Sequence, residues 1–146
     1  MTGYVACSHE DTAMKYMLML YAEEKVGLAI PPEQMSKVME TMGAYQAALE
    51  KAGAFIMTSP LARTSDARTL RMAGGEVVYR PEGAKVFVTE GGELQVHDGP
   101  YADTREQFGG FYMIEARDID EALAWAAKCP AAQWGAIEVR AMMAGY

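Results

Sequence analysis

Apolar and polar residues follow patterns along the chain that predict its strands and helices. Residues 15–22 (KYMLMLYA) form an almost continuous apolar run. A strand with one solvent-exposed face alternates between apolar and polar residues. This run therefore predicts a strand whose two faces are both buried against other parts of the protein. Because one layer of helices covers only one face of a sheet, we expect a second subunit to cover the other.

A helix is predicted over residues 30–53, because apolar residues recur there with the helical period. The apolar stripe comprises Met35, Val38, Met39, Met42, Tyr45 or Gln46, and Leu49. Pro31 and Pro32 suit the start of this helix, and Gly53 suits the residue just after its end. We expect Gly43, in the middle, to mark close packing against a sheet.

A second helix is predicted from Asp118 to the residue before Pro130. Asp118 is expected to cap its N-terminus, with Glu121 as the capping-box partner. Pro130 disfavours helical geometry at Cys129 and therefore ends the helix. The predicted buried stripe consists of Ile119, Ala122, Leu123 and Ala126.

Shorter apolar runs bounded by turn residues predict the remaining strands. They cover residues 54–62, 67–72, 76–80, 85–90, 93–97, 109–117 and 136–142. The sequence PEGA at 81–84 is a turn signal, so residues 74–92 read as a β-hairpin bounded by glycine pairs. The resulting order, β-α-β-(hairpin)-β-α-β, predicts an α+β, ferredoxin-like βαββαβ fold with an antiparallel sheet. Two such sheets packed face to face would form a dimeric α+β barrel.

Length and charge narrow the class of protein. The 146 residues fit one domain, 14–146, after a polar, aperiodic segment at 1–13 that we expect to be a flexible leader. A net charge of −7 disfavours nucleic acid and anionic membranes as partners. Residues 1–13 have neither the basic nor the apolar region of a secretory signal, so we expect none, and Cys7 and Cys129 lie outside any metal-ligand spacing. We expect a reduced, cytoplasmic protein without metal or organic cofactor.

The segment 96–116 (VHDGPYADTREQFGGFYMIEA) holds the densest group of polar and aromatic side chains. Asp98, Gly99 and Pro100 are turn residues, which explains them structurally. The functional interpretation is that Asp98 projects a carboxylate into a cleft, where it acts as a general base or holds a cationic ligand. His97 is a weaker catalytic candidate, because adjacent strand residues point to opposite faces.

The loop that follows also has two interpretations. It is either a short helical turn, capped by Asp103 with Arg105 or Glu106 pairing locally, or a lid over a pocket. In the second case Tyr101 would form an aromatic wall. The candidate ligand-binding residues are Tyr101, Asp103 and Glu106, together with Tyr45 on the first predicted helix.

Three segments, KYMLMLYAEE, DGPYADTREQFGGFYMIEARDIDEALAWAAKCPAA and GAIEVRAM, resemble the YCII-related proteins, in the branch called DGPF-domain proteins. The resemblance implies the dimeric ferredoxin-like fold and marks most of 74–92 as an insertion. Some DGPF proteins are encoded near extracytoplasmic-function sigma factors. A few relatives in the wider group are enzymes for aromatic ring compounds that use a His and an Asp between sheet and helix. The matching positions here are Met42 and Cys129, so that dyad is absent.

Two functional hypotheses therefore stand. In the first, a homodimer binds a small organic molecule, aromatic or carbonyl-containing, in a pocket beside the DGP loop. Asp98 would supply cofactor-free acid/base chemistry, and Tyr101 and Tyr45 would line the pocket. In the second, the protein is a non-catalytic accessory or regulatory module associated with a transcriptional stress response.

Overall fold

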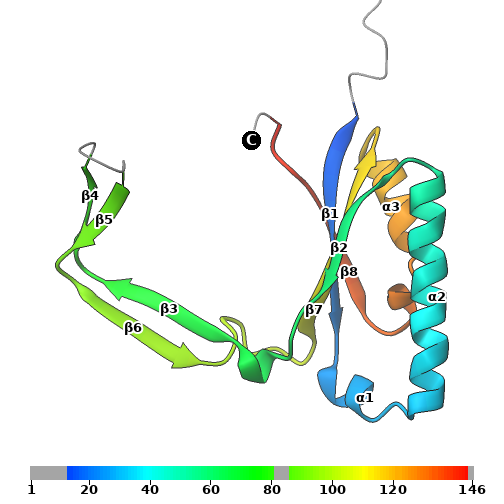
Figure 1. The fold of residues 1–146 in the computed structure, drawn as a ribbon, viewed down its shortest axis with the longest axis horizontal. Coiled ribbons are helices and arrows are strands. Elements are labelled where there is room, and N and C mark those ends of the chain that lie inside the picture. Colours follow the sequence, from blue (N-terminus) through cyan, green and yellow to red (C-terminus); the bar gives the residue numbers. More distant parts are fainter. Residues whose placement is uncertain (1–12, 81–85, 145–146) are drawn as a thin grey trace, which may run out of the picture. The chain divides into compact units, whose positions relative to one another are not determined.

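The computed structural model describes residues 13–80 and 86–144. The chain divides into two compact units, each described by itself (Figure 1). Unit 1 contains residues 13–61 and 104–144, and unit 2 contains Ala62–Asp103. The predicted turn at 81–84 and nearly all of the predicted leader lie outside the described residues.

Unit 1 is a four-stranded antiparallel sheet with helices on one face (Figure 1). Its elements are β1 (Met14–Ala22), α1 (Glu24–Leu28), α2 (Pro32–Lys51), β2 (Phe55–Pro60), β7 (Gln107–Ala116), α3 (Ile119–Lys128), the 3-10 helix η3 (Pro130–Gln133) and β8 (Ala136–Ala141). The strand order is β2-β7-β1-β8, so β1 and β7 are central. This order and the chain order βαββαβ confirm the predicted ferredoxin-like α+β fold.

The core lies between the sheet and the two longer helices. It comprises Tyr16, Leu18, Tyr45, Leu49, Ala54, Tyr112, Ile114, Ala116, Ala122, Ala126 and Cys129. Along β7, Tyr112, Ile114 and Ala116 are buried while Met113 is half-buried and Glu115 is exposed. The predicted alternation of this strand is therefore confirmed.

Strand β1 carries apolar side chains on both faces of the sheet. Tyr16 and Leu18 are buried on the face covered by the helices. Met17 and Met19 point to the opposite face and are half-buried within the single chain. The second subunit expected over that face stays a prediction.

Helix α2 has the predicted ends but a less deeply buried stripe. It starts after Pro31, and Gly53 follows its end with a positive φ of 70°. Tyr45 and Leu49 are buried, but Met39 is 62% exposed. The expectation that Gly43 marks close packing was wrong, because a Cβ there would meet nothing within 4 Å. The space arises because the first half of α2 borders a cavity.

Helix α3 has the predicted cap. The Asp118 carboxylate accepts a hydrogen bond of 2.9 Å from the Glu121 backbone N–H. Ala122 and Ala126 are buried, but Ile119 is 43% and Leu123 49% exposed, so half of the predicted stripe was wrong. The side chains facing the sheet are alanines, and the larger apolar residues lie at the margin of the contact.

Unit 2 consists of two ribbons of two antiparallel strands each. Its elements are the 3-10 helix η2 (Thr64–Asp66), β3 (Arg68–Ala73), β4 (Glu76–Arg80), β5 (Val86–Glu90) and β6 (Glu93–Asp98). Strands β4 and β5 pair as the predicted hairpin requires. Strand β3 pairs with β6, which the sequence patterns did not predict.

Four glycines join the two ribbons of unit 2. Gly74, Gly75, Gly91 and Gly92 all have positive φ, between 69° and 83°. A Cβ on Gly75 would lie 2.9 Å from the Gly91 carbonyl oxygen, and one on Gly92 would lie 2.8 Å from that of Gly74. Both the φ angles and the backbone crowding therefore require glycine at this junction.

Candidate functional site

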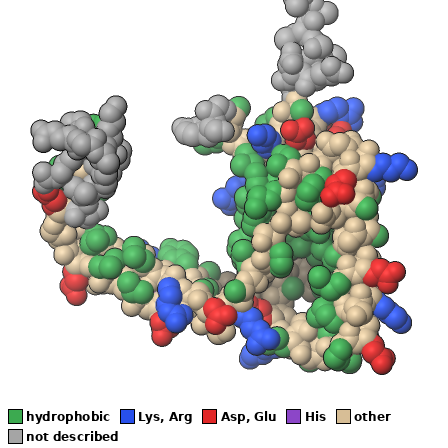
Figure 2. Space-filling view, viewed as in Figure 1, with side chains coloured by type: hydrophobic (Ala, Val, Ile, Leu, Met, Phe, Trp, Pro, Cys, Tyr) green, Lys and Arg blue, Asp and Glu red, His purple; other side chains and the backbone are tan. Residues whose placement is uncertain are grey.

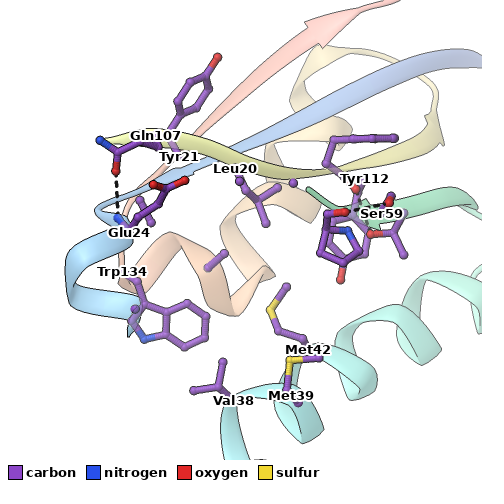
Figure 3. Close-up of a pocket in the computed structure, with 18 of the residues that line it drawn as sticks. Leu20, Tyr21, Glu24, Val38, Met39, Met42, Ser59, Gln107, Tyr112 and Trp134 are labelled. Atoms are coloured by element: carbon purple, nitrogen blue, oxygen red, sulfur yellow. Dashed lines mark hydrogen bonds between the residues drawn. The ribbon is translucent and has the colours of Figure 1, made fainter. Parts of the chain in front are cut away.

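A cavity of about 530 Å³ lies in unit 1 between α2 and the sheet (Figure 3). Its walls come from the end of β1, from α1, α2, β2 and the start of β7, and from the residues around η3. The volume falls within the range of roughly 300–1,000 Å³ that small-molecule sites occupy. Every lining residue belongs to unit 1.

The walls of the cavity are mainly apolar. Val38, Met39 and Met42 project from α2 toward Leu20 on β1, and Trp134 closes one side (Figure 3). Methionine side chains are flexible and polarisable, and they make favourable contacts with aromatic rings. The lining therefore suits an apolar or aromatic molecule.

Missing side chains create this space. Gly43 on α2 and Gly109 and Gly110 on β7 line the cavity without filling it. A Cβ on Gly43 or Gly109 would meet no atom within 4 Å, whereas one on Gly110 would lie 3.1 Å from the Ser59 carbonyl oxygen. Gly43 and Gly109 thus leave open space at the cavity wall, whereas Gly110 permits the β2 backbone to approach closely.

The rim of the cavity is polar. The Gln107 side-chain oxygen accepts a hydrogen bond of 2.9 Å from the Glu24 backbone N–H, and its amide nitrogen donates to the Thr104 carbonyl at 2.6 Å. Arg105 forms an ion pair with Glu23. The hydrogen bond and the charge of Glu23 raise the pKa of the Arg105 guanidinium. These contacts tie the start of α1 to the start of β7.

Several polar side chains on the walls already bond within the protein. The Thr58 hydroxyl donates to the Phe111 carbonyl at 2.9 Å, and the Ser59 hydroxyl donates to the Pro60 carbonyl at 3.0 Å. The Gln46 amide donates to the Glu50 carboxylate at 3.0 Å. A ligand would therefore be held mainly by apolar contacts.

Tyr45 lies in the core and does not line the cavity. Its hydroxyl donates a hydrogen bond of 2.8 Å to the Trp125 carbonyl, and its ring meets Tyr112 edge-on at 5.3 Å. Burial raises the pKa of the Tyr45 hydroxyl, and the same cause raises the pKa of Tyr112. Tyr112 does border the cavity.

The DGP segment forms the end of the β3–β6 ribbon in unit 2. The Gly99 N–H donates to the Ala67 carbonyl at 2.8 Å, and φ of Gly99 is +110°, as its turn role requires. The Asp98 carboxylate pairs with Arg68 at 2.9 Å and is 85% exposed. His97 is exposed and, as the next residue along β6, points to the opposite face. The strand therefore separates these two side chains.

Tyr101 also belongs to unit 2. Its ring is 76% exposed and lies against the Arg71 guanidinium, 5.4 Å from the ring centroid. Arg71 also donates a hydrogen bond of 3.4 Å to the Tyr101 hydroxyl. This contact holds the ring beside the ribbon.

The predicted helical turn at 103–106 was wrong. Asp103 and Glu106 lie in an irregular bend. Hydrogen bonds from the Thr104 hydroxyl to the Glu106 carbonyl and from Gln107 back to Thr104 shape the bend. Arg105 pairs with Glu23, 82 residues away, instead of pairing locally. Asp103 belongs to unit 2 and Glu106 to unit 1.

The two positions at which the enzymatic relatives would carry a His and an Asp have separate surroundings. Met42 lies on the cavity wall. Cys129 is 1% exposed in the core, and burial raises the pKa of its thiol.

The residues 13–80 and 86–144 contain no group of three His, Cys, Asp or Glu placed to hold a metal ion. No helix in this same part of the chain is long and apolar enough to cross a membrane.

Sequence patterns missed most of the cavity. Leu20, Gln107 and Trp134 come from three separate parts of the chain, and no local motif connects them. The signal that could have found the site is the combination of Gly43 in a helix with the Gly109–Gly110 pair in a strand. Glycine inside a strand often marks a place where a ligand or another backbone approaches.

The fold and the cavity define a ferredoxin-like α+β domain with a pocket between its first long helix and its sheet. The YCII-related domain matches residues 14–144. An uncharacterised protein of Rhizobium meliloti (strain 1021) is 34% identical over 113 residues, which cover 77% of each chain. The chain therefore belongs to the YCII-related family.

Proposed function

We propose that the protein binds a small, mainly apolar organic molecule in the cavity between α2 and the sheet. The observation that carries this proposal is a space of about 530 Å³ with a lining rich in methionine and a tryptophan. An aromatic ring gains contacts with Met35, Met39 and Met42 and with Trp134. A carbonyl or similar polar group on the ligand would lie toward the polar rim at Gln107.

Within the family, we propose that the chain belongs to the DGPF branch. The support is the Asp98-Gly99-Pro100 motif, with Gly109-Gly110 behind it. We further propose a cytoplasmic setting without nucleic-acid partners. A net charge of −7 and the free, buried thiol of Cys129 support that setting.

The binding proposal is tested by filling the cavity. Gly43→Leu would place a side chain in the space beside Gly43, so we expect binding of indole and benzaldehyde to weaken at least tenfold. Gly43→Ala controls for the change in helix propensity, and Ala47→Leu adds a leucine side chain at an exposed position of α2. Binding is followed by methyl NMR of the methionines, with Met35, Met39 and Met42 expected to shift.

Two results would contradict this binding site. One is unchanged affinity in Gly43→Leu, and the other is a set of shifts confined to methionines outside the cavity. Failure of every aromatic and carbonyl probe to bind would contradict the proposed ligand class.

Asp98 as an acid/base residue is a further hypothesis within the first function. Its carboxylate is 85% exposed and paired with Arg68. Asp98→Asn keeps the size of the side chain and removes its charge. If the protein converts a compound of the probe panel, we expect the Asp98→Asn variant to lose turnover. Equal turnover in the variant and the natural protein would contradict the catalytic role of Asp98.

The second candidate function, a non-catalytic accessory or regulatory module, has its own support. The Thr58 and Ser59 hydroxyls on the cavity wall both donate to backbone carbonyls. Hydroxyls engaged in this way are less available for proton transfer to a ligand. Binding without turnover across the probe panel is the outcome that this function predicts.

We also propose a homodimer formed through the open face of the unit 1 sheet. Met57 and Met17 both pair with Met113 across the strands, and Met19 pairs with Phe111. These residues share one face, and Met57 is 49% exposed. A contiguous apolar patch of this kind marks an interaction surface. Met113→Asp is expected to shift the protein toward monomer in sedimentation, and a natural chain that is monomeric at micromolar concentration would contradict the dimer.

A further inference from the structure

The β3–β6 ribbon of unit 2 has one apolar and one polar face. Cross-strand register pairs Leu70 with Val96 and Met72 with Leu94, so all four side chains lie on the same face. All four side chains are exposed: Leu70 by 60%, Val96 by 55%, Met72 by 42% and Leu94 by 54%. Figure 2 shows hydrophobic side chains gathered along this ribbon. Within the described part of unit 2, no element covers this face.

The same face ends in a pair of opposite charges. Arg68 and Asp98 lie directly across from each other, two residues before Leu70 and two after Val96, and their side chains pair at 2.9 Å. The opposite face carries Thr69, Arg71, Gln95 and His97. Tyr101 lies against Arg71, so this second face is polar and partly covered by its own loop.

We propose that the apolar face of this ribbon packs against the same face of a second copy of the chain. A two-fold axis along the ribbon would set each β3 residue against its β6 partner in the second copy. Leu70 then meets Val96 of the second copy, and Met72 meets Leu94 of the second copy. Arg68 meets Asp98 of the second copy, so the ends of the two faces have complementary charges. The register thus makes the face self-complementary.

The apolar face of the ribbon is too small to hold two copies together by itself. Six residues per strand span about 20 Å, and two strands span about 10 Å, which gives roughly 200 Å² per copy. A stable interface takes about 800 Å² from each partner. The ribbon contact therefore rests on the homodimer proposed above, whose open sheet face supplies the larger area.

The stability of the ribbon points to the same partner. An isolated ribbon of two strands is only marginally stable in water. Packing of its apolar face in a dimer would protect its backbone, so protection of β3 and β6 amides from hydrogen exchange should rise with protein concentration. Protection that is the same at all concentrations would mean that the chain covers the face itself, and it would overturn the proposal.

Cysteine crosslinking tests the geometry directly. Leu70→Cys and Val96→Cys are made in separate chains, both with Cys7→Ser, then mixed and oxidised with copper–phenanthroline. We expect disulfides between the two variants to form at least tenfold faster than in a mixture of Thr69→Cys and His97→Cys. That control pair occupies the same strands on the opposite face. Equal rates in the two mixtures would overturn the proposed face.

Charge exchange adds a test that does not need a disulfide. Arg68→Asp and Asp98→Arg each place like charges at the contact and should weaken association several-fold, while a mixture of the two variants should restore it. Loss of association that the mixture does not restore would overturn the proposed pairing. If Met113→Asp dissociates a dimer in which the ribbons neither crosslink nor respond to charge, the ribbon contact fails while the homodimer stands. If the natural chain never associates, both proposals fail.

Discussion

Strand β7 in unit 1 and strands β3 and β6 in unit 2 each direct apolar side chains at alternate positions to one face, but the surroundings of that face differ. In β7 the apolar positions include Tyr112 and Ile114, which are 5% and 0% exposed. In the ribbon they include Leu70 and Val96, which are 60% and 55% exposed. Two helices cover one face of the four-stranded sheet, whereas the ribbon has only two strands and no helix. Alternation therefore identifies the face that must be buried, but it does not identify the element or subunit that buries it.

Glycines also differ between the two units. Gly43 and Gly109 in unit 1 leave open space at the wall of the cavity. Gly75 and Gly92 in unit 2 allow two backbone segments to approach so closely that a Cβ would fall within 3 Å of a carbonyl oxygen. Gly43 and Gly109 thus leave open space, whereas Gly75 and Gly92, like Gly110 in unit 1, permit a close approach of two backbone segments.

Truncation of one apolar residue in each unit should give the largest contrast. Ile114→Ala removes a fully buried side chain from unit 1, so we expect the free energy of unfolding to fall by about 2–5 kcal/mol. Leu70→Ala in unit 2 should cost about 0.5 kcal/mol or less in the monomer, because the side chain is 60% exposed. Urea unfolding of dilute protein measures both. A cost for Leu70→Ala similar to that for Ile114→Ala would show that the chain itself buries the ribbon face.

Alanine at one glycine of each unit should change stability in opposite directions. Gly75→Ala forces a side chain into a positive φ of 83° and against the Gly91 carbonyl, so it should destabilise unit 2 by roughly 1–2 kcal/mol or more. Gly43→Ala finds open space in a helix and should stabilise unit 1 by up to about 1 kcal/mol. Hydrogen exchange of the β4 amides and thermal unfolding of unit 1 separate the two effects. Destabilisation by Gly43→Ala would be inconsistent with the open cavity wall.

Alkaline pH should expose a smaller difference between the units. Burial raises the pKa of Tyr45 above its ordinary value near 10, so the folded protein keeps a proton that the unfolded chain releases. Stability is then complete below about pH 10 and falls above it, by up to about 1.4 kcal/mol per pH unit for one group. Tyr45→Phe should make this fall less steep, although it also removes the hydrogen bond to Trp125.

The matched control is Tyr101→Phe in unit 2, whose ring is 76% exposed. Urea unfolding at several values between about pH 9 and 11, on both sides of the ordinary tyrosine pKa, measures the slope for each variant. The prediction fails if Tyr45→Phe and the natural protein lose stability equally with pH, or if Tyr101→Phe has the larger effect.

Much of the fold could be predicted because its determinants lie within a few residues of each other. The cap of Asp118 on the Glu121 N–H, the end of α2 before Gly53 and the alternation of β7 all depend on local geometry. These features placed two helices and four strands in the order of a ferredoxin-like domain. The turn at Asp98-Gly99-Pro100 was predictable for the same reason, since glycine supplies the positive φ.

The sequence by itself thus determined the strands and the two longer helices of unit 1, their order and the buried face of β7. Only the tertiary structure decided where the cavity lies, because its walls join elements that are separate in sequence. It also paired Arg105 with Glu23 across 82 residues, and it paired β3 with β6. The physical reason is that backbone propensities act over a few residues, whereas cavities and ion pairs depend on which distant side chains the packing brings together.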